Sequence, residues 1–126
     1  MTALPPAEVA KLQAKVKRTC LEDALAFAIE RAKLPSPVRE YPGVVAGRDF
    51  RFDFAWPEYM VLAEVDGGTW PGKDGKQAGR HIRGKGYEDG CEKCNGAVLA
   101  GYRVLRFTAA MVKDGRAVAA IRAALK

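Results

Sequence analysis

Hydrophobic and polar residues alternate along this chain with two periods, one typical of helices and one typical of strands. Apolar positions at helical spacing predict a first amphipathic helix over residues 6–18. Thr19 and Glu22 then fit a capping box, which predicts the start of a second helix that ends near residue 34, before the sequence "LPSP". We therefore expect the chain to begin with two consecutive helices.

Beyond these helices the pattern changes to short extended segments separated by turns. Three strands, a helix, a strand and a closing helix are expected near 38–45, 50–56, 60–65, 87–102, 103–108 and 114–126. This order predicts an α/β fold in one domain, residues 1–126, with a mixed sheet that contains an antiparallel hairpin and is flanked by helices.

The second and third strands form a predicted hairpin in which acids stand among aromatic and aliphatic residues. Successive residues of a strand point to opposite faces of the sheet. Phe50, Phe52 and Phe54 are therefore expected to share an apolar face, and Asp53 to lie on the other face. The hairpin thus predicts a core side and a charged side.

The charged side of the hairpin is expected to hold three acids. A two-residue turn at 57–58 opposes Asp53 to Leu62 and places Glu64 diagonally from Asp53, with Asp66 following on the same face. Diagonal neighbours have Cα atoms about 7–8 Å apart, within reach of one shared cation. Magnesium prefers oxygen ligands of this kind, together with water and substrate phosphate.

Charge and composition favour a polyanionic partner for this acidic face. The chain has 126 residues and a net charge of +6, and a basic, glycine-rich segment over 66–86 leaves the strand that bears the acids, which suits contact with phosphates. The alternative is a solvated sheet face on which Arg48 and Arg51 balance the acids. The adjoining basic segment weakens that alternative.

The same composition bears on cellular location. No apolar run approaches the roughly 20 residues that a membrane helix needs, and the N-terminus lacks the apolar region of a signal peptide. Three clustered cysteines do not form a disulfide framework. We therefore expect a cytoplasmic protein without a membrane partner, in a prokaryotic or phage-infected cell.

Several motifs occur together in one order. They are Asp53, "EVDGG" at 64–68, "GRH" at 79–81, Asp89 with "EK" at 92–93 and Asn95, and "GYRVLRF" at 101–107. As a set they resemble the small PD-(D/E)xK nucleases of the restriction-endonuclease-like fold, over roughly residues 20 to 110. The resemblance is strongest to phage-type Holliday junction resolvases similar to the archaeal resolvases, with very-short-patch-repair-like endonucleases as relatives.

This resemblance implies a Mg²⁺ site, with Mn²⁺ as a substitute, and a lysine that assists the attacking water. The implied ligands are Glu22, Asp53, Glu64 and the carbonyl of Val65. This chain departs from the family at Asp66, which stands where the family keeps its lysine. Either Asp66 takes part in metal binding, or the task of the lysine has moved, with Lys93 on the following helix as the candidate.

Each of these side chains also has a simpler interpretation. Lys93 is at the spacing of a surface ion pair with Asp89, and Glu22 is the glutamate of the capping box. His81, the only histidine, is either a general base or phosphate contact, or an incidental loop residue. Trp70 either stacks on a base or packs its own loop down.

Two further groups are candidate sites. Cys91 and Cys94 form a C-x-x-C without a second pair at zinc-finger spacing, and they lie on the apolar stripe of Tyr87 and Val98. We therefore predict core cysteines rather than zinc ligands. A basic group in the first helix either tracks phosphates or is simply solvated, and consists of Lys11, Lys15, Lys17 and Arg18.

The function that these features imply is metal-dependent, structure-selective cleavage of DNA, by paired cuts in a four-way junction. Paired cuts require two sites, so a two-fold homodimer is expected. A strand- or mismatch-nicking endonuclease of the same fold and a non-catalytic DNA-binding module are the alternatives. The predicted DNA contacts are Arg48, Arg51, Trp70, Lys73, Lys76, Arg80, Arg83 and Lys85.

Overall fold

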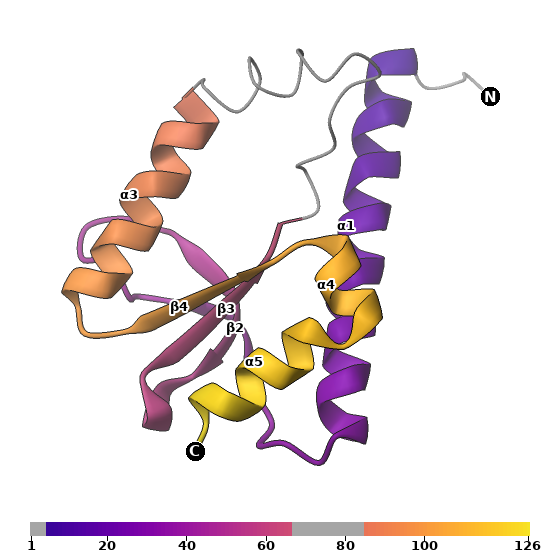
Figure 1. Ribbon diagram of the computed structural model, residues 1–126. Coiled ribbons are helices and arrows are strands. Elements are labelled where there is room, and N and C mark those ends of the chain that lie inside the picture. Colours follow the sequence, from indigo (N-terminus) through magenta and orange to yellow (C-terminus); the bar gives the residue numbers. More distant parts are fainter. Residues whose placement is uncertain (1–4, 67–84) are drawn as a thin grey trace.

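In the computed structural model, a four-stranded sheet lies between two layers of helices (Figure 1). The structure describes residues 5–66 and 85–126; at 14–19 and at Lys85 it describes the backbone alone. The elements are α1 (Pro6–Arg31), β1 (Val38–Pro42), β2 (Arg51–Trp56), the 3₁₀-helix η1 (Pro57–Tyr59), β3 (Val61–Val65), α3 (Lys85–Leu99), β4 (Arg103–Phe107), α4 (Ala109–Asp114) and α5 (Arg116–Ala124).

The sheet has the order β1-β2-β3-β4. β1, β2 and β3 pair antiparallel, and β4 runs parallel to β3. The predicted α/β class, with a mixed sheet, an antiparallel hairpin and flanking helices, is confirmed. None of the described helices combines the length and the apolar character needed to cross a membrane.

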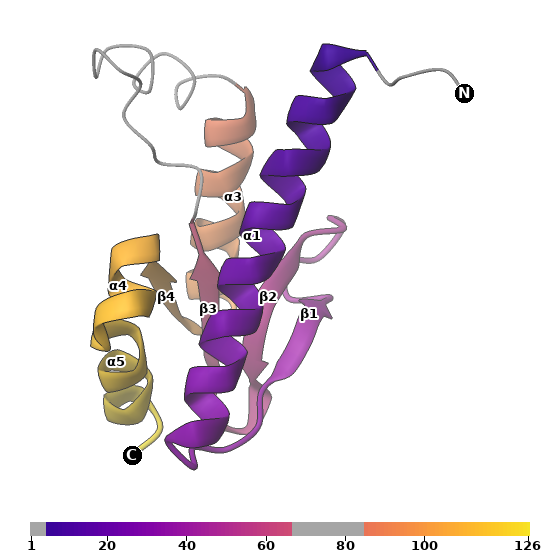
Figure 2. The ribbon, with the colours of Figure 1, turned by 90° about the vertical axis from the view of Figure 1, so that its right-hand side faces the viewer.

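The two faces of the sheet are covered unequally. Helices α1, α4 and α5 cover one face, and α3 covers the other (Figure 2). The larger core lies under the first group and includes Leu25, Ile29, Phe54, Trp56, Val61, Ala63, Val65, Phe107 and Ile121. The smaller core lies under α3 and consists of Phe52, Ala55, Leu62 and Ala97.

The N-terminal third is one helix, so the prediction of two helices meeting at Thr19 was wrong. Helix α1 continues through Thr19, and Glu22 lies in its interior rather than in a capping box. The Ser/Thr-x-x-Glu pattern marks a helix start only where the chain enters a helix. No glycine or proline occurs between Ala7 and Arg31 to interrupt the backbone hydrogen bonds.

The β2–β3 turn is longer than predicted. Pro57–Tyr59 form the 3₁₀-helix η1, and Met60 follows with a left-handed φ of 55°. The register pairs Trp56 with Val61 and Phe54 with Ala63. The loop remains even in length, so the parity of the predicted pairing is preserved, but the pairing shifts by two residues.

The phenylalanines of β2 do not share one face, contrary to the prediction. Phe52 belongs to the smaller core under α3, whereas Phe54 belongs to the larger core under α1. Strict alternation would place these two residues on the same side. The alternation is therefore broken at Asp53, which lies between them.

Helix α3 does not pack on the sheet through its apolar stripe. Tyr87 and Val98 are 51% and 58% exposed, and Cys91 is exposed, so this stripe does not point to the core. The helix instead packs through small residues: Ala97 is buried, and a side chain at Gly96 would meet Val45 at 2.8 Å. The prediction of core cysteines is wrong for Cys91.

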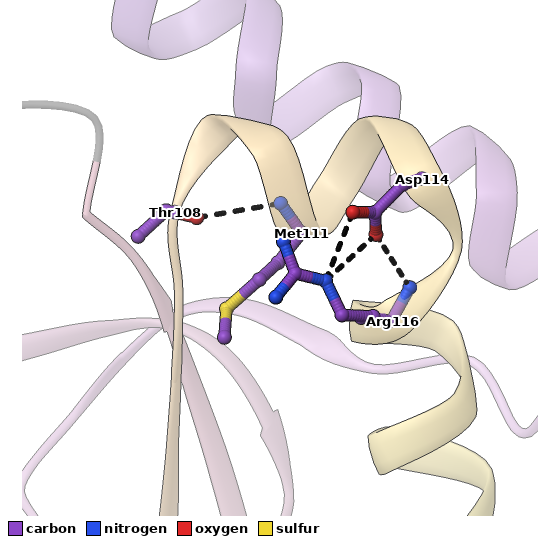
Figure 3. Close-up of polar contacts among 4 residues, drawn as sticks. All are labelled: Thr108, Met111, Asp114 and Arg116. Carbon is purple, nitrogen blue, oxygen red and sulfur yellow. Dashed lines mark hydrogen bonds and ion pairs between the residues drawn. The ribbon is translucent and has the colours of Figure 1, made fainter.

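The closing helix predicted over 114–126 is observed as α5, and a short helix that was not predicted, α4, precedes it. Thr108 caps α4 by accepting a hydrogen bond from the Met111 N–H at 3.3 Å. Gly115, with φ 91°, separates α4 from α5. The Asp114 carboxylate accepts hydrogen bonds from the backbone N–H and from Nε of Arg116 across this break (Figure 3). The left-handed glycine therefore marks the boundary between α4 and the predicted closing helix.

Candidate metal centre

Asp53 lies where β2 and β3 cease to pair. The last backbone pair of this ladder is Phe54 with Ala63. One residue further, Asp53 Oδ2 accepts a hydrogen bond from the Val65 N–H at 2.8 Å. The carboxylate thus takes the place of a backbone acceptor, and this position accounts for the broken alternation of β2. It also brings Asp53 close to residues from both helical layers.

An acidic cluster forms around Asp53 on the side of α1. Carboxylate oxygens of Glu22, Glu40 and Asp53 all lie within 4.8 Å of one another. They come from α1, β1 and β2, and Glu22 is buried while Glu40 is exposed. Arg39 is the nearby positive group: its Nη2 lies 3.7 Å from Glu22, and its guanidinium stacks on the Phe54 ring at 4.8 Å.

Glu40 was not predicted as a site residue. Its neighbours Arg39 and Tyr41 pair with Phe54 and Phe52, so Glu40 stands opposite Asp53. It adopts a left-handed φ of 52°, which is unusual for a residue other than glycine. The signal that would have identified Glu40 is the pairing of β1 with β2, which places it opposite Asp53.

Glu64 and Lys93 meet on the α3 side of the sheet. Continuing the β2–β3 register by one residue places Glu64 opposite Asp53. Oε1 of Glu64 is shielded from solvent and forms an ion pair with Nζ of Lys93. The same ammonium lies 4.6 Å from the centre of the Phe52 ring. The structure therefore brings Lys93 to the acid of β3, while Asp89 lies 3.6 Å from Arg48.

The acids of this centre are difficult to ionise together. Burial, followed by the charges of Asp53 and Glu40, raises the pKa of Glu22 to about 7, against the opposing effect of Arg39. Burial and Asp53 raise the pKa of Glu64 to about 8, although Lys93 acts in the opposite direction. Near neutral pH these two carboxyl groups are thus partly protonated. A cation between them would favour their ionised forms.

Asp66 is held by a residue of the last strand. Its Oδ2 lies 2.6 Å from Nη2 of Arg106, and its backbone N–H donates to the Phe107 carbonyl at 2.7 Å. Glu64 pairs with Arg106 in the parallel β3–β4 register, so Arg106 lies beside both acids. Asp66 is therefore an acid paired with arginine, and the lysine that reaches Glu64 comes from α3.

The other predicted site residues are only partly described. Arg48 forms ion pairs with Glu92 and Asp89 of α3 and stacks on Phe50 at 4.3 Å, which fastens the β1–β2 connection to α3. Arg51 is exposed at the start of β2. The remainder lie outside the described residues or, for Lys85, lack a described side chain: Trp70, Lys73, Lys76, Arg80, His81, Arg83 and Lys85.

The donor set suits a hard divalent cation. Its described donors are carboxylate oxygens. Mg²⁺ and Mn²⁺ prefer such hard oxygen ligands over softer sulfur ligands. Asp53 lies between Glu22 and Glu40 on one side and Glu64 on the other, so it can share a cation with either group. The arrangement can therefore hold a cation at the end of the two central strands, β2 and β3. Comparison with protein-family models, with curated proteins and with solved structures finds no match to this chain.

Proposed function

We propose that this protein is a metal-dependent, structure-selective DNA endonuclease with a restriction-endonuclease-like core, and that it resolves four-way DNA junctions. One observation carries the proposal: Lys93 contacts Glu64, next to Asp53, at the point where two central strands separate. An aspartate, a glutamate and a lysine at one place are the groups that the resembling nucleases use. Here the lysine comes from α3 rather than from β3.

The residues of the site have separate tasks in this proposal. Asp53, Glu64 and the carbonyl of Val65 hold Mg²⁺ or Mn²⁺. When bound, the metal polarises the phosphodiester and stabilises the leaving oxygen. With Glu64 engaged as a metal ligand, the Lys93 ammonium would orient the attacking water or stabilise negative charge on the phosphate.

Glu22 and Glu40 enlarge the acidic surface on the α1 side of Asp53. Asp66 has a different task in the proposal. Its pairing with Arg106 favours a role in positioning the end of β3 rather than in holding the metal. This pairing favours one of the two alternatives that the sequence left open for the missing lysine. The proposal accordingly assigns the task of the lysine to Lys93 and keeps Asp66 outside the set of metal ligands.

A junction resolvase makes two opposed cuts, so the proposal includes a two-fold pair of chains with one site each. A nicking endonuclease needs only one chain. The two activities therefore differ in the symmetry of their products, which a cleavage assay reads directly.

The test is incubation with an end-labelled four-way junction and with a linear duplex of matched sequence, with and without Mg²⁺. We expect symmetric nicks in the junction alone, and only with the metal. Asp53→Asn should slow cleavage by about 100-fold or more, because a catalytic metal contributes several kcal/mol to the transition state. Junction binding in EDTA should be retained, since the variant removes negative charge from a DNA-facing site.

Asp49→Asn is the matched control, because Asp49 is an exposed acid in the connection before β2 and lies outside the acidic cluster. It should cleave like the wild type. Equal cutting of junction and duplex would favour the nicking enzyme. Binding without any cleavage of branched, nicked or linear DNA would leave a DNA-binding module and refute the nuclease.

A further inference from the structure

The first half of α1 extends away from the body of the protein. Its described side chains, those of residues 6–13 and Cys20, are all exposed, whereas Glu22, Leu25 and Ile29 in the second half are buried. Figure 2 shows the first half continuing past the sheet. At a rise of 1.5 Å per residue, α1 reaches about 24 Å beyond Glu22 toward the N-terminus.

This projecting half has no described core contact to explain its stability. Its described apolar residues Val9 and Leu12 are not buried, since they are 36% and 51% exposed. Short helices without tertiary packing are marginal in water. The described side chains at 6–13 therefore leave this half of α1 accessible to a partner.

The charge of the segment selects the class of that partner. Residues 6–20 carry one acid, Glu8, and four bases, which gives a net charge of +3; the bases are Lys11, Lys15, Lys17 and Arg18. A basic helix of this kind complements a polyanion rather than a second copy of itself, which would carry the same charge. Nucleic acid phosphates are spaced to meet such a series of cations.

We propose that residues 6–20 form a basic arm that contacts the phosphate backbone of the duplex leading away from the cleaved phosphate. This inference rests on the proposed function, because it takes the cleaved phosphate to lie at the acidic cluster. The arm and Glu22 belong to the same helix, so a duplex that leaves the cluster along α1 stays beside the arm. A reach of about 24 Å corresponds to roughly seven base pairs at 3.4 Å each.

The test compares two doubly substituted variants that remove the same charge. Lys11→Gln with Lys15→Gln changes the arm, while Lys113→Gln with Lys126→Gln changes two exposed lysines in α4 and at the C-terminus. Glutamine and lysine have similar helix propensity, so α1 should be retained, as circular dichroism would verify. Binding of a fluorescent four-way junction is measured across 50–200 mM salt. EDTA is present throughout, so that cleavage does not affect the result.

For the arm variant we expect the slope of log K against log salt to become shallower by about 1.8, since each lost phosphate contact contributes about 0.9. The control should keep the wild-type slope. A wild-type slope in the arm variant would overturn the proposal, and junction cleavage by the wild type would then leave the proposed function standing. If the arm variant has a shallower slope but the wild type cleaves no DNA, the proposed nuclease function is refuted and the proposed DNA contact of the arm is retained.

A second copy is the competing occupant of this helix. Sedimentation without DNA distinguishes it, because an arm variant that dissociates from dimer to monomer, with an unchanged salt slope, would assign the arm to self-association.

Discussion

Lys93 balances a carboxylate that the fold has largely removed from water. Its ammonium contacts Glu64 and rests on the Phe52 ring, so its position is set by two groups of the sheet rather than by its own helix. A surface lysine would have neither contact. This is the residue on which the proposed chemistry of the site most directly depends.

Lys93→Met keeps the length and the apolar stem of the side chain and removes the charge. We expect single-turnover cleavage of a four-way junction to fall by about 100-fold or more, the range of a lost proton-transfer or charge-stabilising group. Junction affinity in EDTA should change little, because the single charge that is lost is already paired with Glu64. Lys113→Met serves as the control, and wild-type cleavage by Lys93→Met would contradict the assignment.

The raised pKa values of Glu22 and Glu64 predict how stability depends on pH without metal. In the unfolded chain both groups ionise near their ordinary pKa of 4.5, whereas in the folded protein their pKa values are about 7 and about 8. Between pH 5.5 and 9 the folded state thus holds protons that the unfolded state has released, so stability falls as pH rises.

Thermal unfolding in EDTA between about pH 5.5 and 9 measures this dependence on proton binding. The melting temperature should decrease across the range for the wild type. Glu22→Gln combined with Glu64→Gln should flatten the curve, because neither side chain then titrates. A wild-type melting temperature that increases with pH would show that these two groups do not dominate.

At the scale of elements, the order and type of most segments could be predicted from the sequence, because period and turn residues are local signals. The first helix boundary could not, since the pattern around Thr19 and Glu22 also fits a helix interior. The helix stripe at Tyr87 and Val98 was misleading for another reason. Packing of α3 is decided by close approach at Gly96, which hydrophobic periodicity does not register.

The candidate site was predictable in part. The alternation of the hairpin predicted one face shared by Asp53, Glu64 and Asp66. The even loop keeps Asp53 beside Glu64 despite the wrong turn length, but the alternation of β2 breaks at Asp53. The contribution of Glu40 depends on the pairing of β1 with β2, and the approach of Glu22 depends on how α1 crosses the sheet. These are relations between distant segments, which local patterns do not contain.

Two glycines of α3 test how closely this helix approaches the rest of the protein. A Cβ at Gly90 would meet nothing within 4 Å, so Gly90→Ala should raise the free energy of unfolding by about 1 kcal/mol through helix propensity. A Cβ at Gly96 would lie 2.8 Å and 2.9 Å from the methyl carbons of Val45. Such overpacking costs about 1–3 kcal/mol and should outweigh the same gain.

Urea denaturation of the two variants gives the comparison directly. Gly96→Ala should be less stable than Gly90→Ala and no more stable than the wild type. Equal stabilisation by both substitutions would mean that Val45 moves aside at no cost.

At the scale of the whole molecule, the raised pKa values of Glu22 and Glu64 show that ionising these acids costs stability without metal. The proposed function predicts that a bound cation offsets this cost. Mg²⁺ should raise the melting temperature, since a ligand at 100 times its Kd stabilises by about 2.7 kcal/mol. Asp53→Asn should remove this response. Its amide oxygen can still accept the Val65 N–H, and one repelling charge is lost, so the variant should be at least as stable as the wild type in EDTA.

Calorimetry with and without Mg²⁺ measures both effects, with Asp49→Asn as the control that keeps the metal response. A full Mg²⁺ response in Asp53→Asn would place any bound cation elsewhere.

The outer strands of the sheet determine how two copies can meet. β1 and β4 are its edges. β1 ends in Pro42, which lacks a backbone donor, and contains the left-handed Glu40, while β4 carries Arg103 and Arg106. Proline, an irregular backbone and charge all hinder the addition of a further strand. A two-fold pair of this protein should therefore form through helices or loops rather than by continuing one sheet across both chains, and amyloid-like stacking at these edges is opposed for the same reason.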